Sequence, residues 1–246
     1  MINLPHNINF LEYSVFTDAL NKLPSAKKVL ISTINQYSYC IAKKDFLFKN
    51  ALSNSDVLLP DGMAIVWATK FLYGKKIKKN AGSDVHKFLL KKLNETSGSC
   101  FYLGSSPETL SRIKERVSVE FPNINIEVHS PAFKPNFSAL ESEQMIKVVN
   151  NFKPDVLFVG MTAPKQEKWS YEHKEQLDAK IICSVGAVFD FYAGTVERPN
   201  KIWRDNGLEW FGRLLKEPKR LWKRYLYYGL IFLGYLLEEK WKLVLK

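Results

Sequence analysis

The chain has 246 residues, of which 46% are hydrophobic and 25% charged, and it carries a formal net charge of +11. This length fits one α/β domain with an appendage, and the composition excludes disordered, collagen-like and other fibrous proteins. A strongly basic chain favours an acidic partner, and nucleic acid, phosphate ligands and an anionic membrane surface are the candidates.

The N-terminus and the cysteines indicate where the protein works. Met1–Phe16 has neither a basic start nor a continuous apolar run, so we expect no signal peptide there. No stretch reaches the roughly 18 consecutive apolar residues of a membrane span. Cys40, Cys100 and Cys183 are too few for a disulfide framework, and the last two lie in apolar runs. We therefore expect buried free thiols in a reducing compartment.

The body of the chain alternates short apolar runs with helical patterns, which predicts an α/β fold with a mainly parallel sheet and helices on both faces. Strands are expected at 28–33, 57–59, 101–103, 124–129, 156–159 and 180–185. Helices are expected at 36–52, 63–73, 84–93, 107–121, 138–151 and 166–176.

The loops after the first two strands carry polar side chains where ligands bind in parallel sheets, at the carboxyl ends of the strands. Thr33 and Asn35 follow the first strand and can hold a sugar or phosphate, although Asn is also a preferred helix N-cap. Asp61 lies between a strand and a helix, where it can act as a general base or as a turn residue. Both interpretations stay open for each loop.

The loop after the third strand contains Gly104, Ser105 and Ser106, followed by Pro107. Proline at the first position of a helix marks a helix start, and free backbone N–H groups there suit a diphosphate. The alternative is an ordinary capped strand–helix junction.

Two later segments combine polar and small residues. The segment 160–169 holds an amide (Gln166), an acid, two lysines and an indole, a mixture that favours a binding site. The segment 184–194 is rich in small residues, and we interpret it as a loop that allows the backbone close to a ligand. Its Asp190 needs a partner if buried, and pairing with Arg198 or capping of a loop is the structural alternative.

Several motifs are absent, which narrows the chemistry. There is no G-x-G-x-x-G after the first strand, no G-x-x-x-x-G-K-[ST] and no G-x-S-x-G. There is no Asp-x-Asp pair, and the histidines at 6, 86, 129 and 173 show no metal spacing. The sequence therefore predicts no nicotinamide cofactor, no other cofactor and no metal site.

The composition changes near Pro199, so we divide the chain into a catalytic part, 1–199, and a helical appendage, 200–246. Residues 201–246 hold eleven Lys and Arg, five Asp and Glu, and four of the six tryptophans. On a continuous helix, the spacing of Arg213, Arg220 and Arg224 places them on one face. Such a face is either a clamp for a polyanion or a solvated basic surface. Pro218 can interrupt the helix or start a second one.

Residues 225–237 carry no charge and are apolar nearly all round on a helix. The run is too short to span a bilayer. Aromatic residues within it and basic residues around it are typical of a helix that lies in the headgroup region of an anionic membrane. The alternative is a helix buried in the core.

Together these motifs resemble the WecG/TagA/CpsF glycosyltransferases, over residues 28–225. The motifs that carry the resemblance are Thr33-x-Asn35, Pro60-Asp61-Gly62, Gly160-x-x-x-Pro164-Lys165-Gln166-Glu167-x-Trp169, Phe189-Asp190-x-x-Ala193-Gly194 and Gly207-Leu208-Glu209-Trp210-x-x-Arg213-Leu214-x-x-Glu217-Pro218-x-Arg220. The resemblance implies a Rossmann-like catalytic domain and a membrane-attached appendage. It also implies sugar transfer from a nucleotide donor to a polyprenyl-diphosphate-linked sugar, in teichoic-acid or other cell-surface polysaccharide synthesis.

The resemblance also implies roles for individual residues. Asp61 resembles the family's proposed catalytic base, and Thr33, Asn35 and Gln166 match its substrate pocket. The three appendage arginines resemble those thought to close over the acceptor diphosphate. Lys79 stands where the family usually has arginine, and Ala187 replaces a usual glycine. The predicted substrate-binding residues are Thr33, Asn35, Lys79, Gly104, Ser105, Gln166, Asp190, Arg213, Arg220 and Arg224.

The expected reaction is an inverting, metal-independent transfer from a UDP-sugar, with Asp61 deprotonating the acceptor hydroxyl. The helix N-terminus after Gly104 and nearby cations are expected to stabilise the leaving UDP. UDP-N-acetylmannosamine is the donor favoured by analogy; UDP-glucose and the uronic acid derivative of N-acetylmannosamine stay open. We expect a peripheral protein on the inner face of a bacterial cell membrane, and a homo-oligomer stays open.

Two other functions are weighed against this one. A nucleotide-sugar epimerase or dehydrogenase lacks support because the dinucleotide fingerprint is missing. A nucleic-acid-binding protein needs a basic stripe with aromatic stacking platforms, whereas here the tail charges flank an apolar run, so no nucleic-acid partner is expected.

Overall fold

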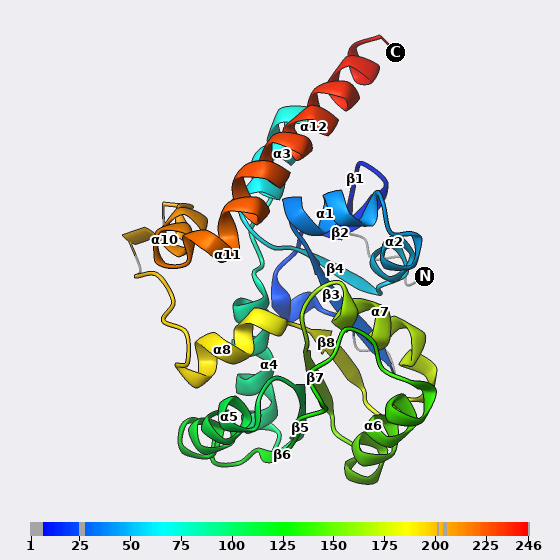
Figure 1. Ribbon diagram of the computed structural model, residues 1–246, viewed down its shortest axis with the longest axis vertical. Coiled ribbons are helices and arrows are strands. Elements are labelled where there is room, and N and C mark those ends of the chain that lie inside the picture. Colours follow the sequence, from blue (N-terminus) through cyan, green and yellow to red (C-terminus); the bar gives the residue numbers. More distant parts are fainter. Residues whose placement is uncertain (1–6, 25–27, 201, 204–205, 246) are drawn as a thin grey trace.

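The computed structural model describes residues 7–24, 28–200, 202–203 and 206–245 (Figure 1). His6 and four charged residues of the tail, Lys201, Arg204, Asp205 and Lys246, lie outside the described residues.

A six-stranded sheet in the order β4-β3-β8-β7-β5-β6 forms the centre of the molecule, and each neighbouring pair is parallel. Its strands are β3 (Val29–Ile34), β4 (Val57–Pro60), β5 (Ser99–Gly104), β6 (Asn125–His129), β7 (Val156–Gly160) and β8 (Ile181–Ser184). The predicted α/β fold with a parallel sheet is confirmed.

Helices cover both faces of the sheet (Figure 1). They are α1 (Gln36–Ala42), α2 (Phe46–Ser53), α3 (Met63–Tyr73), α4 (Gly82–Glu95), α5 (Pro107–Glu120), α6 (Ala139–Phe152), α7 (Lys165–Glu172), α8 (Gly186–Ala193), α10 (Glu209–Lys216), α11 (Pro218–Trp222) and α12 (Tyr228–Val244). Short 3₁₀ segments are η1 (Leu20–Lys22) and η2 (Lys174–Gln176), and a π-helical segment, η3 (Lys223–Tyr227), precedes α12.

The period-2 alternation of strand side chains divides the core between the two faces. On β5, Tyr102 packs with side chains of α4, α5 and α8, whereas Phe101 and Leu103 pack with those of α6 and α7. Because both faces are covered, the inner strand β7 is apolar along its whole length, whereas the edge strand β6 alternates Ile126 and Val128 with polar residues.

Three predicted elements differ in the structure. The single helix expected at 36–52 is two helices, because Asp45 accepts a hydrogen bond from the Phe48 amide and starts α2. The helix expected at 166–176 ends at Glu172 and continues as η2. The segment 184–194, interpreted as a loop, contains the helix α8, because its Phe189 ring is buried in the core.

An antiparallel hairpin of β1 (Asn7–Phe10) and β2 (Tyr13–Phe16) lies outside the predicted elements. Phe10 and Tyr13 are buried in a cluster that also holds side chains of α1, α3 and α12. The hairpin is therefore stabilised by residues far away in the chain.

The predicted helical appendage forms α10 to α12. Pro218 starts α11, which was one of the two roles expected for this proline. One side of α12 packs on the body: Phe232 and Leu236 are buried, and the Phe232 ring lies 5.4 Å from the Tyr39 ring. Among the described residues, no helix is both long and apolar enough to cross a membrane. The division of the chain at residue 199 stays a prediction.

The three cysteines, Cys40, Cys100 and Cys183, are free and buried, as expected. Burial in apolar surroundings raises the pKa of the Cys40 thiol to about 12, so it is protonated at neutral pH.

Candidate active site

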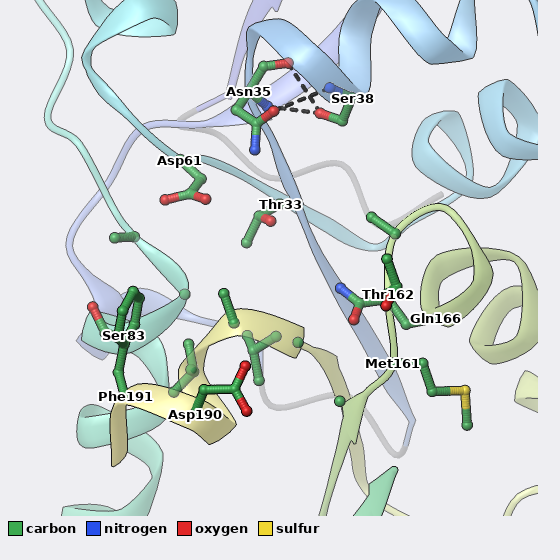
Figure 2. Close-up of a pocket in the computed structure, with 18 of the residues that line it drawn as sticks. Thr33, Asn35, Ser38, Asp61, Ser83, Met161, Thr162, Gln166, Asp190 and Phe191 are labelled. Atoms are coloured by element: carbon green, nitrogen blue, oxygen red, sulfur yellow. Dashed lines mark hydrogen bonds between the residues drawn. The ribbon is translucent and has the colours of Figure 1, made fainter. Parts of the chain in front are cut away.

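A pocket of about 990 Å³ lies at the carboxyl ends of the strands and extends to the appendage. Figure 2 shows Thr33, Asp61, Gln166 and Asp190 pointing into it from different elements. All sequence-predicted site residues line this pocket: Thr33, Asn35, Asp61, Lys79, Gly104, Ser105, Gln166, Asp190, Arg213, Arg220 and Arg224. The structure thus brings together residues nearly two hundred positions apart in the sequence.

Asp61 follows β4, and its backbone N–H donates to the Ile34 carbonyl at the end of β3 (2.9 Å). This bond extends the pairing of the two strands by one residue and directs the carboxyl into the pocket. Desolvation and the charge of Glu209 raise the pKa of Asp61, while Arg224 and other cations oppose the rise. A carboxylate with a raised pKa is a better proton acceptor, as a general base requires.

Thr33 and Asn35 lie at the end of β3. The Asn35 side-chain oxygen accepts from the backbone N–H groups of Tyr37 and Ser38 and forms a capping box, so the helix-capping interpretation is confirmed. Since this oxygen is occupied, only the amide N–H₂ of Asn35 is left to face a ligand (Figure 2).

The end of β5 approaches β7 closely at Gly104. Its φ is +120°, and a Cβ there would lie 2.3 Å from the Gly160 carbonyl oxygen, so only glycine fits. Ser106 then caps α5 by accepting from the Thr109 N–H at 3.2 Å, with Pro107 at the start of the helix. The capped junction is therefore confirmed, and it forms part of the pocket wall.

Gln166 and Glu167 begin α7 and are both buried at the pocket. Gln166 Nε2 donates to Glu167 Oε1 at 2.8 Å. Burial raises the pKa of Glu167 to about 7, although the hydrogen bond from Gln166 and the charge of Arg224 both lower it. The mixed composition of segment 160–169 marked it as a binding site, but it did not single out Glu167.

Asp190 lies on α8, and its pairing with Arg198, weighed above as the structural alternative, is not found. Arg198 pairs with Glu209 instead, in a bidentate arrangement at 2.7 and 3.1 Å. Desolvation raises the pKa of Asp190, and the charges of Arg220 and Arg213 lower it. The carboxyl of Asp190 faces the pocket (Figure 2).

Glu209, at the start of α10, joins the appendage to the body. Besides Arg198 it meets Lys79, whose Nζ lies 3.5 Å from Glu209 Oε2, and all three side chains line the pocket. Sequence reasoning named Lys79 but not its partner, because charges so far apart in the chain give no local pattern. Glu209 does lie in the motif Gly207-Leu208-Glu209-Trp210, which was the available signal.

The three predicted arginines line one pocket from three segments of the appendage. Arg213 lies on α10, Arg220 on α11 and Arg224 on η3, so the helix is broken at Pro218, one of the two outcomes expected for that residue. The carbon Cζ of Arg213 lies 4.9 Å from the Phe191 ring centre, and that of Arg224 lies 4.8 Å from the Tyr37 ring centre.

The three arginines differ in whether they form an ion pair. Arg220 forms an ion pair with Glu217, whereas Arg213 and Arg224 form no ion pair with any described residue. Two guanidinium groups that line one pocket without a direct ion pair favour an anionic ligand, and their charges also act on the Asp61 carboxyl. Within the described ranges, no group of three or more His, Cys, Asp or Glu side chains is arranged to hold a metal ion.

Comparison with known proteins identifies the family. The profile described as the glycosyl transferase WecG/TagA/CpsF family matches residues 3–245. The chain belongs to this family. It is therefore a hexosyltransferase, which decides against the nucleic-acid-binding and dinucleotide-dependent alternatives.

Three similar proteins carry the name N-acetylglucosaminyldiphosphoundecaprenol N-acetyl-beta-D-mannosaminyltransferase. The relative from Bacillus subtilis (strain 168) is 31% identical over 96% of this chain and 91% of its own length. Relatives from Staphylococcus aureus (strain MW2) and Bacillus spizizenii (strain W23) are 27% and 28% identical, over 80% and 83% of this chain and 76% and 77% of their own lengths.

Proposed function

We propose that this glycosyltransferase moves N-acetylmannosamine from UDP-N-acetylmannosamine to N-acetylglucosamine linked through a diphosphate to a polyprenol. The names of the relatives support this donor and acceptor. The observation that carries the proposal is a desolvated carboxyl, Asp61, in the same pocket as Arg213 and Arg224, which form no close ion pair within the described part of the chain. A base beside an anion site is what transfer to a diphosphate-linked alcohol requires.

In this mechanism, Asp61 takes the proton of the acceptor hydroxyl. The hydroxyl oxygen forms a bond to the anomeric carbon of the donor as the bond from that carbon to the UDP oxygen breaks. One such displacement inverts the anomeric configuration. The charge that develops on UDP needs preorganised positive groups. Arg198 and Lys79 share the single carboxylate of Glu209, and Arg220 pairs with Glu217, so Arg213 and Arg224 are the strongest candidates to support a metal-independent reaction.

We further propose that the protein docks on the inner face of the cell membrane through its appendage, without spanning it. One face of α12 is exposed and apolar, with side chains three or four residues apart: Leu230, Leu233, Leu237, Trp241 and Val244. On the adjacent α3, Trp67 and Phe71 are half exposed, and Lys240 donates to the Phe71 carbonyl at 3.1 Å. Apolar side chains beside lysines suit an anionic headgroup layer.

A donor screen tests the proposed function. The purified protein is mixed with a short-chain lipid-diphosphate-N-acetylglucosamine acceptor and, separately, with UDP-N-acetylmannosamine, UDP-glucose or UDP-N-acetylmannosaminuronate. We expect a disaccharide product from the first donor at a rate at least tenfold above the others. A faster reaction with either of the other donors would refute the proposed sugar while leaving the reaction class intact.

A further inference from the structure

The Gln166–Glu167 pair contains hydrogen-bonding capacity that the protein does not use. The exposed fractions of these residues are 5% and 3%. Gln166 Nε2 donates to Glu167 Oε1, yet the fully buried Gln166 Oε1, like Glu167 Oε2, has no hydrogen-bond partner among the described residues. A buried acceptor without a partner costs about 1–3 kcal/mol, so it is expected to have a use.

The geometry around that oxygen points to a ligand. Gly186, at the start of α8, leaves space for it: a Cβ at Gly186 would lie 2.4 Å from Gln166 Oε1. Gly186 and both members of the pair line the pocket. The residues around this buried oxygen thus belong to the wall of the candidate active site, and only glycine at position 186 allows its present position.

The charge state of Glu167 decides which end of the Gln166 amide is free. An ionised carboxylate only accepts hydrogen bonds, so Gln166 must turn its N–H₂ toward Glu167 and leave its oxygen free. A protonated Glu167 can donate to the Gln166 oxygen instead, and the reversed amide then presents N–H₂.

We propose that Glu167 is a positioning residue that holds the Gln166 carboxamide with its oxygen free to accept a hydrogen bond from an N–H or O–H of the sugar nucleotide. This inference rests on the proposed function and adds to it a selection for a hydrogen-bond donor on the ligand. The acetamido N–H and the hydroxyls of an N-acetylhexosamine are groups of this kind.

Burial and nearby charges have opposite effects on the pKa of Glu167. Arg224 of η3 acts on it and favours its ionised form, while burial opposes ionisation and raises its pKa to about 7. On its own helix, Lys165 donates to the Lys134 carbonyl and Lys168 pairs with Asp45 of α2. Donor binding should therefore strengthen as the pH rises through about 7.

Titration calorimetry tests the inference. The Kd of UDP-N-acetylmannosamine is measured between pH 6 and pH 8.5 for the wild type and for Glu167→Gln. We expect the wild type to bind roughly 3- to 10-fold more tightly at pH 8.5 than at pH 6, the worth of one neutral hydrogen bond. Glu167→Gln should bind with the weaker, pH-independent Kd, because a carboxamide at 167 accepts either orientation of Gln166.

Two further variants separate positioning from other effects. In a Gln166→Ala background, Glu167→Gln should change Kd no further, because its action runs through Gln166. Glu172→Gln makes the same chemical change at an exposed position of α7 and should keep the wild-type profile. Removing a buried charge is expected to leave the fold intact, and thermal unfolding checks this.

Two results would overturn the inference: a wild-type pH profile in Glu167→Gln, or an undiminished effect of Glu167→Gln in the Gln166→Ala background. Failure of the proposed function looks different, because the wild type then transfers another sugar. In that case the Kd of the sugar nucleotide that the enzyme does use is measured for the wild type and the same variants.

Discussion

Three carboxyl groups of the pocket, those of Asp61, Glu167 and Asp190, share a raised pKa with one main cause, desolvation. Their neighbours distinguish them. Asp61 has a second carboxylate, Glu209, among its neighbours, whereas Glu167 is held by the amide beside it. Different environments for similar groups are how one pocket assigns different roles to them.

Replacing Asp61 with Asn keeps the shape of the side chain and removes its ability to take a proton. We expect kcat to fall by roughly 10²–10⁴-fold, the usual contribution of a general base, with the donor Kd little changed. Initial rates with a short-chain acceptor measure this. Asp178→Asn, an exposed aspartate, is the matched control. Near-wild-type turnover in Asp61→Asn would exclude it as the base.

The raised pKa of Asp61 also predicts a pH dependence. The base must be ionised, so kcat falls as the pH is lowered through its pKa. Because desolvation and Glu209 raise that pKa, the fall should occur above the range of an ordinary aspartate. In Glu209→Gln the midpoint should move to lower pH, and an unmoved midpoint would mean that another group limits the rate.

Glu167 links stability to pH with a defined sign. Its pKa is about 7 in the folded protein and near 4.5 in the unfolded chain, so the folded state binds more protons between these values. Stability from this group is therefore complete at low pH and is lost as the pH rises from about 4.5 through about 7. Glu167→Gln should raise the Tm at pH 8 by more than at pH 5 in calorimetric scans, and an equal change at both would contradict the shift.

At the level of elements, the appendage contributes charge to the pocket from three short helical segments. The break at Glu217 and the π-helical segment η3 change the direction and register of the chain between Arg213, Arg220 and Arg224. The three arginines therefore reach the pocket from three differently directed segments rather than from one helix face.

Replacing Arg213, Arg220 and Arg224 with Gln should weaken acceptor binding or abolish turnover. Each charge-assisted hydrogen bond to a diphosphate is worth about 1.5–3 kcal/mol. The measurement is acceptor KM and kcat with a water-soluble acceptor. The control replaces three exposed lysines of the same segments, Lys216, Lys219 and Lys223, which removes the same charge outside the pocket. Equal effects of the two triple replacements would mean that the arginines act only as a general basic surface.

If these cations take the place of a metal, excess EDTA should leave the rate unchanged. The assay follows UDP release with and without the chelator. Loss of activity that Mn²⁺ or Mg²⁺ restores would refute the metal-independent mechanism.

Over the whole molecule, α12 and α3 lie together and project from the body at one end, away from α5 and α6 (Figure 1). The exposed apolar side of α12 therefore stands clear of the sheet, while its opposite side is buried against α1. The core-helix alternative therefore holds for the side of the run 225–237 that carries Phe232 and Leu236, and membrane contact stays a proposal for its exposed side.

Replacing Leu230, Leu233 and Leu237 with Ser should reduce binding to anionic liposomes at least several-fold, because buried apolar area drives interfacial binding. Activity on a water-soluble acceptor should persist, since these side chains lie on the exposed side of the helix. Sedimentation with vesicles measures binding. The control makes the same change at three exposed apolar residues elsewhere, Leu47, Val119 and Leu140. Unchanged sedimentation of the α12 variant would place the membrane contact elsewhere.

Local sequence pattern was enough to locate the six strands of the parallel sheet and the loops at their ends, but not the hairpin strands β1 and β2. Apolar runs bounded by Gly, Pro and Asp reflect burial on both sheet faces, and parallel strands bring their carboxyl ends to one edge. That is why the loops that hold Thr33, Asp61 and Gln166 could be proposed as binding loops from the pattern, whereas the roles of the three residues came from the family resemblance.

Contacts between residues that are distant in the sequence were determined by the tertiary structure alone. Arg198 pairs with Glu209 rather than Asp190, α8 is a helix because its Phe189 enters the core, and α12 is buried on one side only. Each outcome depends on side chains that meet across many residues of sequence, and neither charge nor hydrophobic period encodes which distant group will be near. The sequence therefore determines which chemical groups the pocket contains, and packing determines which of them remain free for the substrate.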